Sequence, residues 1–332
     1  MLGIDGGGTE TIAAVADTDG RVLGLAKAGC GCFEDVGDAS AQMETRKAIL
    51  EALKNAGVRD EKLIGACYGM AGADREKDYA RIRAFLDPIN PARCMSIRND
   101  IDLILKAGIP DEIGIAVGCG TGTNCIGRNR NGRRIQVGGL GYELGDRAGG
   151  TYLGLVALHQ AMRGQDGRGA PTMLHDAICR TLEVESLVDI VDRFYLGARR
   201  KLDFSTLAPV VFECASAGDE VAADLLSQMA NEVASMIRVA RSHLFDRDET
   251  VKAVLGGGLI KAHQFDLAGR VEDVLTDETM RFTVISLNTE PVVGAIFYAL
   301  SECELRITED VVRTTMTSLA LALKREEVKS GG

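Results

Sequence analysis

The stretch GIDGGGTETIAAVADTDGR, residues 3–21, has a close counterpart later in the chain, AVGCGTGTNCIGRNRNGRR at residues 116–134. Within them, residues 4–21 align with residues 116–133 without a gap, at a constant offset of 112 residues that takes Gly6 to Gly118 and Gly20 to Gly132. Each contains an apolar run, a Gly/Thr loop, a second run, a Gly turn and a third run. We therefore predict that the same strand–loop–strand unit opens each of two domains.

The length and the order of the patterns predict the limits of these domains. A chain of 332 residues is long for a single hydrophobic core, so two domains are expected. The first is predicted over residues 1–112 together with a last helix at about 308–332, and the second over residues 113–307. After each set of strands, helical and strand patterns alternate, which is typical of α/β domains. The second domain carries a helical insert at about 148–250, whose clearest helix spans 219–245.

Composition and charge exclude several classes of partner. The net charge is −10 and no dense Lys/Arg block occurs, which argues against nucleic acid or an anionic membrane surface as a partner. No apolar run approaches the ~20 residues that a membrane helix needs. No leader pattern precedes residue 3, so we expect a cytoplasmic protein. The closest pair of cysteines, Cys30 and Cys32, has no second pair at metal-ligand spacing.

The two Gly/Thr loops suit the binding of phosphate. A tight turn of Gly and Thr presents backbone N–H groups and hydroxyls with no bulky side chain in the way. One such loop is weak evidence because Gly-rich hairpins are common, but two at a constant offset predict a pair that holds one phosphate ligand. The P-loop pattern GxxxxGK[ST] is absent. A Rossmann loop would lead into a helix, whereas both loops here lead into a strand.

Two further features favour a magnesium nucleotide as the ligand. Asp5 precedes the first loop, whereas Val117 occupies the corresponding position of the second. A carboxylate on one side only suggests Mg²⁺ near the phosphates, held directly or through water. A third Gly loop, residues 256–258, follows an apolar strand pattern. It is either a close approach of backbone to the ring or ribose of a nucleoside, or a simple turn from strand to helix.

The motifs GIDGGGTET, GCGTGTN, GGLGYELGDRAGG and LGGGLIKA have the order and spacing of the actin-like sugar-kinase superfamily. Within it the chain most closely resembles the BadF/BadG/BcrA/BcrD ATPase family, to which N-acetylglucosamine kinase belongs, and the resemblance covers nearly the whole chain. It implies two actin-like (ribonuclease H-like) α/β domains, each with a mixed five-stranded sheet flanked by helices. It also implies that ATP binds in a cleft between them.

The resemblance implies specific nucleotide contacts. Asp5 is the residue expected near Mg²⁺, and Gly257 and Gly258 are expected beside adenosine. The residues expected to hold the phosphates are Gly6, Gly7, Gly8, Thr9, Thr11, Gly120, Thr121, Gly122 and Thr123.

The resemblance also implies a catalytic base at the end of the fourth strand. Where N-acetylglucosamine kinases carry Thr-Asp, this chain has Asn99-Asp100. A sugar hydroxyl that attacks a γ-phosphoryl group needs a carboxylate to orient it and to accept its proton. Judged from the residues alone, Asp100 could equally cap the helix predicted for IDLILKAG. The resemblance favours the base.

The predicted sugar site departs from the family pattern at two places. GGLGYELGDRAGG resembles the sugar loop, usually GGWG…GDEGS, but Arg147, Ala148 and Gly149 replace Glu, Gly and Ser. Cys32 stands where the family often has Asn. Arg147 is either a solvated loop charge or a contact for an anionic substrate. The residues expected at the substrate are Asn99, Asn124, Gly139, Asp146, Gly72 and Cys32.

The sequence therefore predicts an ATP-dependent kinase of a small sugar, with N-acetylglucosamine or glucosamine as the expected kind of substrate. One alternative is a kinase of a sugar acid such as 2-keto-3-deoxygluconate, whose carboxylate would suit Arg147. Another is an activator ATPase of the BadF type, which would hold an iron–sulfur cluster through Cys30 and Cys32. A non-catalytic regulator is disfavoured because Asp5, Asp100 and both loops are present. We expect a homodimer.

Overall fold

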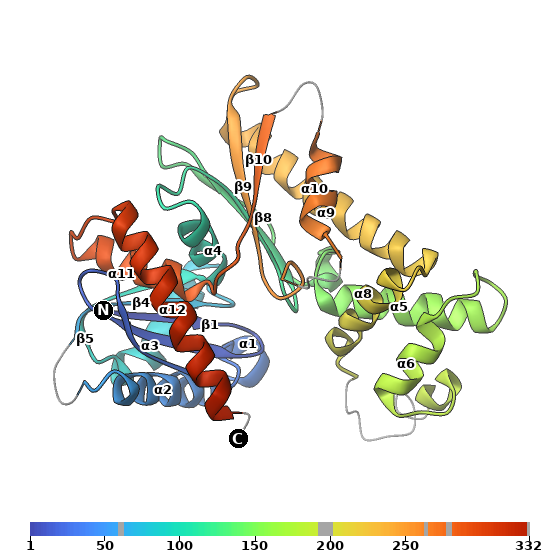
Figure 1. Ribbon diagram of the computed structural model, residues 1–332, viewed down its shortest axis with the longest axis horizontal. Helices are drawn as coiled ribbons and strands as arrows, with labels where there is room; N and C mark the ends of the chain where they lie inside the picture. Colours follow the sequence, from blue (N-terminus) through green and yellow to red (C-terminus); the bar gives the residue numbers. More distant parts are fainter. Residues whose placement is uncertain (59–62, 192–201, 262–264, 277–280, 331–332) are drawn as a thin grey trace. The chain divides into compact units, whose positions relative to one another are not determined.

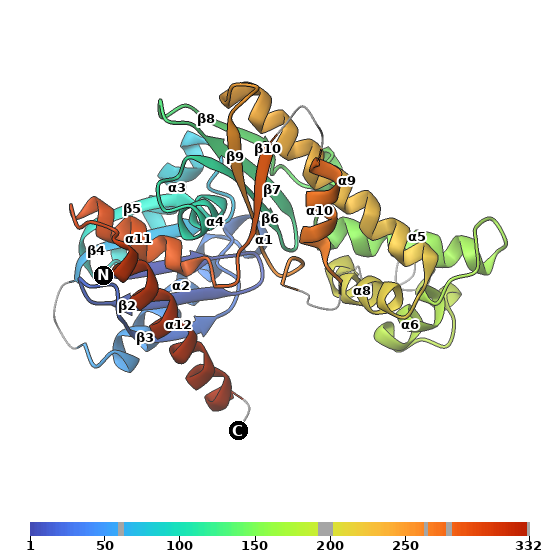
Figure 2. The same cartoon turned by 45° about the horizontal axis from the view of Figure 1, so that its top comes forward.

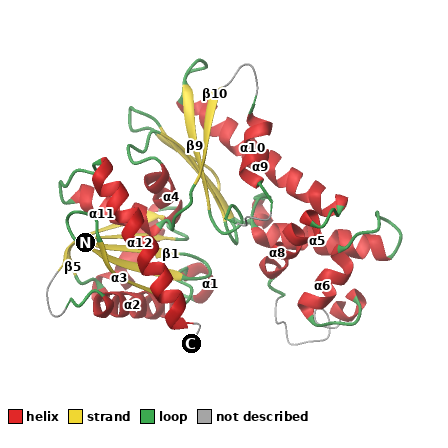
Figure 3. Cartoon of the chain, in the orientation of Figure 1, coloured by secondary structure: helices red, strands yellow, loops and turns green. Residues whose placement is uncertain are grey.

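A computed structural model gives the structure of the chain, and residues 1–58, 63–191, 202–261, 265–276 and 281–330 are described. The chain divides into two compact units. The first consists of Met1–Glu112 and Leu287–Gly332, and the second of Ile113–Ser286. Each contains a five-stranded sheet flanked by helices, which confirms the predicted fold class (Figures 1 and 3).

The sheet of the first unit has the strand order β3-β2-β1-β4-β5. Its strands are β1 (Leu2–Gly6), β2 (Thr11–Ala16), β3 (Val22–Ala28), β4 (Leu63–Met70) and β5 (Ala92–Asn99). β1, β2 and β3 form an antiparallel meander, whereas β4 and β5 run parallel to β1. The carboxyl ends of β1, β4 and β5 therefore meet at one edge of the sheet, where the loops that follow them gather.

Helices cover both faces of this sheet because its central strands are apolar on both sides. Leu2 and Ile4 are fully buried in a core shared with α2 (Asp38–Asn55) and α3 (Glu76–Leu86). Gly3 faces the other way, and a Cβ added there would lie 2.9 Å from the backbone nitrogen of Ile296.

Ile296 belongs to α11 (Val292–Glu302), which packs on β1 and β4. α4 (Asp100–Gly108) lies on the same face, because a Cβ at Gly294 would meet the carbonyl oxygen of Leu103 at 2.1 Å. The short helix α1 (Phe33–Val36) follows β3.

The boundary between the two units differs from the predicted one, because α11 belongs to the first unit. The sequence assigned residues up to 307 to the second domain, but the structure assigns everything from Leu287 onward to the first unit. Every residue from Val292 to Leu300 is buried. A helix that is apolar all round must be covered on several sides, and β1, β4 and α4 supply that cover. The last helix, α12 (Glu309–Ser330), packs on β3.

The sheet of the second unit repeats the plan of the first. Its order is β10-β9-β6-β7-β8, with β6 (Gly114–Cys119), β7 (Thr123–Arg128), β8 (Arg134–Gly138), β9 (Thr250–Gly256) and β10 (Arg281–Ser286). β6, β7 and β8 are antiparallel, and β9 and β10 run parallel to β6. The repeat seen in the sequence is thus a repeat of structure.

Between β8 and β9 the second unit carries the predicted helical insert. Its longer helices are α5 (Gly150–Gln165), α6 (Leu174–Leu182), α8 (Ala208–Ser216) and α9 (Glu220–Leu244), and α10 (Leu267–Leu275) follows β9. Figure 2 shows that α9 runs from the sheet to the group formed by α5, α6 and α8. Among the helices that the structure describes, none has the length and apolar character to cross a membrane.

The start of α9 is fixed by a buried carboxylate, which gives a test of the insert. Asp219 is 6% exposed, and its Oδ1 accepts a hydrogen bond from the nitrogen of Ala222 (2.7 Å). Its Oδ2 accepts from Thr172 Oγ1 (2.8 Å) and from Met173 N (2.5 Å). We expect Asp219→Ala to lower the free energy of unfolding by about 2–4 kcal/mol, because a helix cap and two charge-assisted hydrogen bonds are lost.

Thermal and urea unfolding would measure this change. Glu220→Ala is the matched control, because Glu220 is the exposed neighbour on the same helix turn. Its effect should stay within about 0.5 kcal/mol. Equal stability of the two variants would contradict this account of the insert.

Candidate active site

The first Gly/Thr loop, residues 6–11, joins β1 to β2 in a tight turn. Gly7 N donates to the carbonyl of Glu10 (3.0 Å), which closes the turn. The nitrogen of Ala71, just after β4, donates to the carbonyl of Gly6 (2.9 Å) and ties the loop to the neighbouring strand. Gly8 and Thr9 are exposed. The loop is therefore held from behind while its tip is open.

The second Gly/Thr loop, residues 118–123, joins β6 to β7 and is held by the start of α5. Gly150 N donates to the carbonyl of Gly120 (2.8 Å). A Cβ at Gly149 would lie 2.7 Å from the carbonyl carbon of Gly122, so glycine is needed at this close approach. A Cβ at Gly120 or Gly122 would itself meet no atom within 4 Å. This loop, too, is anchored on one side and open on the other.

The open glycines have no structural reason to be glycine. Gly120, Gly122 and Gly258 all combine free space around a Cβ with a φ outside the left-handed region. Other open glycines such as Gly37 and Gly132 have φ values of 80° and 77°, which disfavour any side chain. The absence of a side chain at the three loop positions therefore points to a ligand that approaches the backbone closely.

The two corresponding threonines have different surroundings. Thr11 is fully buried and its Oγ1 donates to the carbonyl of Gly29 (2.8 Å), so its hydroxyl supports the first loop. Thr123 is 5% exposed, and its Oγ1 has no hydrogen-bond partner in the part of the chain that the structure describes. A buried hydroxyl without a partner is uncommon, so Thr123 is the better candidate for a contact with phosphate.

The third Gly loop lies directly beside the second. Gly257 has φ 97°, and a Cβ there would come within 2.4 Å of the carbonyl oxygen of Cys119. Leu259 N donates to that same oxygen (3.1 Å). The hydrogen bond to Cys119 holds a turn after this loop, and the next described helix, α10, begins at Leu267.

Asp100 is the first residue of α4, at the carboxyl end of β5. The cap of α4 is Asn99, whose Oδ1 accepts a hydrogen bond from Ile101 N (3.1 Å). The amide nitrogen of Asn99 donates to Asp74 Oδ1 (3.0 Å) and to the carbonyl of Ala73 (3.2 Å). The structure thus assigns the capping position to Asn99 and not to Asp100.

The pKa of Asp100 is raised from its ordinary 3.8 to about 6, mainly because the carboxyl is removed from water. The backbone N–H of Ile101 acts in the opposite direction, and the nearby carboxylates of Asp74 and Asp102 contribute to the rise. Asp74 was not singled out from the sequence. It follows β4 in the stretch GMAGAD, and a carboxylate just after a parallel strand was the signal that could have identified it.

This pKa predicts how activity should depend on pH. A base must be deprotonated to accept a proton, so kcat/KM should fall tenfold per pH unit below about 6. Asp74→Asn removes a neighbouring negative charge, so the midpoint should move to lower pH. A profile of kcat/KM from pH 4.5 to 8.5, recorded for wild type and for Asp74→Asn, would measure this midpoint. A midpoint that does not respond to Asp74→Asn would contradict the coupling of the two carboxylates.

Asp5 is the carboxylate that the sequence analysis expects near Mg²⁺. It lies near the end of β1, paired in register with Gly69 of β4. The Cβ position of Gly69 is filled by Leu103 of α4, so Asp5 faces the side of the sheet that carries α4. The described residues contain no group of three or more His, Cys, Asp or Glu placed to hold a metal. A single carboxylate fits Mg²⁺ that is bound mainly by phosphates and water.

The residues predicted for the sugar loop are brought together in the second unit. Asp146 is 8% exposed, and its Oδ2 accepts from Leu140 N (2.8 Å) and Gly141 N (2.7 Å). Gly139 has φ 82°, and a Cβ there would lie 2.4 Å from Oδ1 of Asn124. Asn124, Gly139 and Asp146 thus form one cluster. Within this cluster, the carboxylate of Asp146 holds the loop by accepting hydrogen bonds from backbone nitrogens of the loop.

The predicted substrate residues of the first unit also come together. Gly72 has φ 80°, and a Cβ there would lie 3.0 Å from the ring of Phe33, which follows Cys32. The next residue, Ala73, is hydrogen-bonded to Asn99.

Cys32 is 5% exposed and burial raises the pKa of its thiol to about 12. Burial also raises the pKa of Cys30. Because a thiolate is the form that ligates iron, this pair gives no support to a cluster site.

Two units built on one five-stranded plan, each opened by a Gly/Thr loop, define an actin-like nucleotide-binding protein. The model of the BadF/BadG/BcrA/BcrD ATPase family matches residues 2–299. The chain belongs to this family, as its sequence motifs indicated.

Known proteins resemble the chain over nearly their whole length. The N-acetylmuramic acid/N-acetylglucosamine kinase of Clostridium acetobutylicum is 28% identical over 304 residues, which cover 92% of this chain and 99% of that protein. The N-acetyl-D-glucosamine kinase of Dictyostelium discoideum is 29% identical over 316 residues, 91% of this chain and 98% of that protein. A structure from Chromobacterium violaceum, provisionally assigned as an N-acetylglucosamine kinase, has a TM-score of 0.72 at 23% identity and covers 90% of this chain and 98% of that one.

Proposed function

We propose that this protein transfers the γ-phosphoryl group of ATP to a hydroxyl of an amino sugar of the N-acetylglucosamine or glucosamine kind. The observation that carries the proposal is Asp100, a carboxylate at the strand edge whose pKa is raised to about 6. It belongs to the unit that bears the first Gly/Thr loop. Similarity to sugar kinases over most of the chain supports the substrate class.

In the proposed reaction Asp100 orients a sugar hydroxyl and accepts its proton while the oxygen attacks the γ-phosphorus and ADP leaves. The open backbone of both Gly/Thr loops binds the triphosphate, and Gly257 and Gly258 lie against adenosine. Asp5 would hold Mg²⁺, which would neutralise the charge of the phosphates. The other residues proposed to bind and orient the sugar are Gly72, Asn99, Asn124, Gly139 and Asp146.

A coupled assay of ADP release over amino sugars, neutral hexoses and sugar acids tests this function. We expect release that depends on the sugar and on Mg²⁺, with the highest kcat/KM for an amino sugar, and a phosphomonoester product visible by ³¹P NMR. Asp100→Asn serves as the inactive control. ADP release that no sugar stimulates would contradict the proposal. The homodimer stays a prediction, which sedimentation of the purified protein can test.

A further inference from the structure

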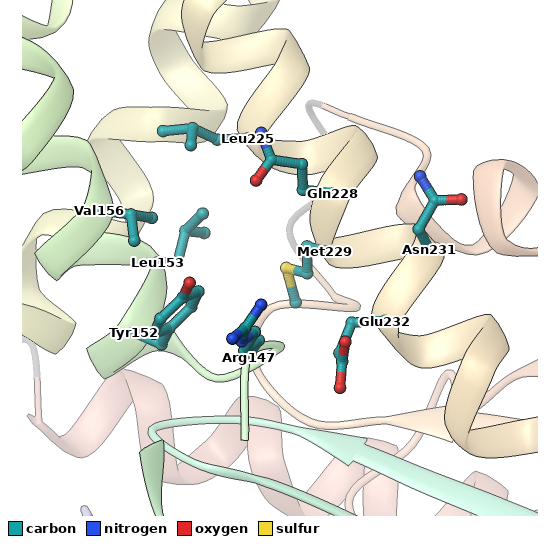
Figure 4. Close-up of a pocket in the computed structure, with 9 residues that line it drawn as sticks. All are labelled: Arg147, Tyr152, Leu153, Val156, Leu225, Gln228, Met229, Asn231 and Glu232. Carbon is teal, nitrogen blue, oxygen red and sulfur yellow. The ribbon is translucent and has the colours of Figure 1, made fainter. Parts of the chain in front are cut away.

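A pocket of about 280 Å³ between α5 and α9 is lined by Arg147, Leu153 and Met229 among others (Figure 4). Arg147 directly follows Asp146 of the sugar loop, so this pocket belongs to the candidate site already described. A different feature, a pair of free cysteines in the first unit, lies outside that site.

The two cysteines of this pair, Cys94 and Cys303, are far apart in the sequence but close in the structure. Cys94 of β5 is paired in register with Gly65 of β4, so both positions point to the same face of the sheet. A Cβ at Gly65 would lie 2.6 Å from Sγ of Cys303, the residue that ends α11. Since paired strands are about 4.8 Å apart, this sulfur lies at most about 7 Å from the Cβ of Cys94.

Other contacts between β5 and α11 support this proximity. Arg98, on the same face of β5 as Cys94, forms an ion pair with Glu302 (2.7 Å) and lies 4.9 Å from the ring of Tyr298. α11 therefore runs along β5 in the opposite direction, which brings Cys303 to Cys94. Burial raises the pKa of the Cys303 thiol, and the nearby Cys94 adds to the rise, whereas the amino terminus lowers it.

The position of the pair suits a reversible link that leaves the candidate site untouched. Cys94 is exposed and Cys303 is half-buried, so a small molecule can reach the pair. Cys94 belongs to residues 1–112 and Cys303 to residues 287–332, the two chain segments that make up the first unit. Asn99 and Asp100 lie at the other end of β5, about 17 Å or more along the strand from Cys94.

We propose that Cys94 and Cys303 are a reversible oxidation site, whose disulfide links the two chain segments of the first unit. The oxidant is a small disulfide of the glutathione kind. The Cys94 thiolate attacks one of its sulfurs, and a first glutathione thiolate leaves. The Cys303 thiolate then attacks Sγ of Cys94 and expels the second glutathione. Two protein thiols are oxidised, and one small disulfide is reduced to two thiols, which take up the two protons.

Glutathione buffers with a rising oxidised fraction, applied to the full chain, test this site. Thiol titration and peptide mass spectrometry are the readouts. We expect two thiols to be lost per chain, a linked Cys94–Cys303 peptide to form, and an excess of reduced glutathione to reverse both changes. The melting temperature of the oxidised protein should rise by about 5 °C or more, because the link restrains the unfolded chain.

Three variants assign the link to this pair. Cys94→Ser should lose both the linked peptide and the rise in melting temperature, and Cys303→Ser should instead retain one glutathione on Cys94. Cys30→Ser is the matched control, because Cys30 is another partly exposed cysteine of the first unit, and it should behave as wild type. The inference would be overturned if oxidised wild type carried only glutathione adducts, or if its disulfide mapped to Cys30 and Cys32 instead.

Discussion

Asp100→Asn is expected to lower kcat by about 10²–10⁴-fold, which corresponds to about 3–5 kcal/mol of activation free energy. An amide neither carries the charge that orients the sugar hydroxyl nor accepts its proton. The pKa of about 6 makes Asp100 a better proton acceptor than an ordinary aspartate. Steady-state kinetics on the best sugar found, with the KM for ATP measured in parallel, would separate a loss of the base from a loss of nucleotide binding.

The fold of this variant should be intact, because Asn99 remains as the cap of α4. The raised pKa also fixes the direction of the effect on stability. Between pH 3.8 and about 6 the folded state binds more protons than the unfolded state, so ionisation of Asp100 lowers stability as the pH rises. Asp100→Asn should therefore melt at or slightly above the wild-type temperature at pH 7. A variant that retains more than about a tenth of the wild-type kcat would show that Asp100 is not the base.

The sequence predicted the architecture well because its strongest signal was local and repeated. Both Gly/Thr loops lie between adjacent antiparallel strands, so the pattern of residues 3–21 was enough to predict the start of each sheet. The helix predicted at 219–245 is observed at Glu220–Leu244, since a long amphipathic pattern is reliable. α11 was assigned to the wrong unit because a uniformly apolar helix carries no sign of which sheet covers it.

The sequence predicted the site residues that lie within a single motif. It missed those that come together only because different elements pack against each other. Asp74 approaches Asp100 because β4 and β5 are neighbours in the sheet, and no spacing in the sequence encodes that. Thr11 and Thr123 occupy equivalent positions of the repeat, yet Thr11 donates to Gly29 and Thr123 has no such partner in the described structure. Identical residues at equivalent positions of the repeat therefore have different surroundings, which the sequence did not predict.

Gly120→Val is expected to weaken ATP binding by at least about 100-fold, or about 3 kcal/mol, while the fold is preserved. A Cβ at this position would meet no heavy atom of the rest of the chain within 4 Å, and its φ is not left-handed, so the substitution causes no clash at the Cβ. The side chain would instead fill the space in which the backbone of the second Gly/Thr loop is proposed to approach the phosphates. The loss should thus appear in the Kd for MgATP and not in the melting temperature.

Gly149→Ala is the matched contrast, because glycine at that position is required by the fold. Its Cβ would lie 2.7 Å from the carbonyl carbon of Gly122, and the start of α5 would have to shift away from the loop. Gly149→Ala should therefore lower the melting temperature, whereas Gly120→Val should not. Isothermal calorimetry with a non-hydrolysable ATP analogue, together with thermal unfolding, would distinguish the two effects. Near-normal affinity in Gly120→Val would show that the open space beside this glycine does not receive the triphosphate, and the proposed role of the second loop would be wrong.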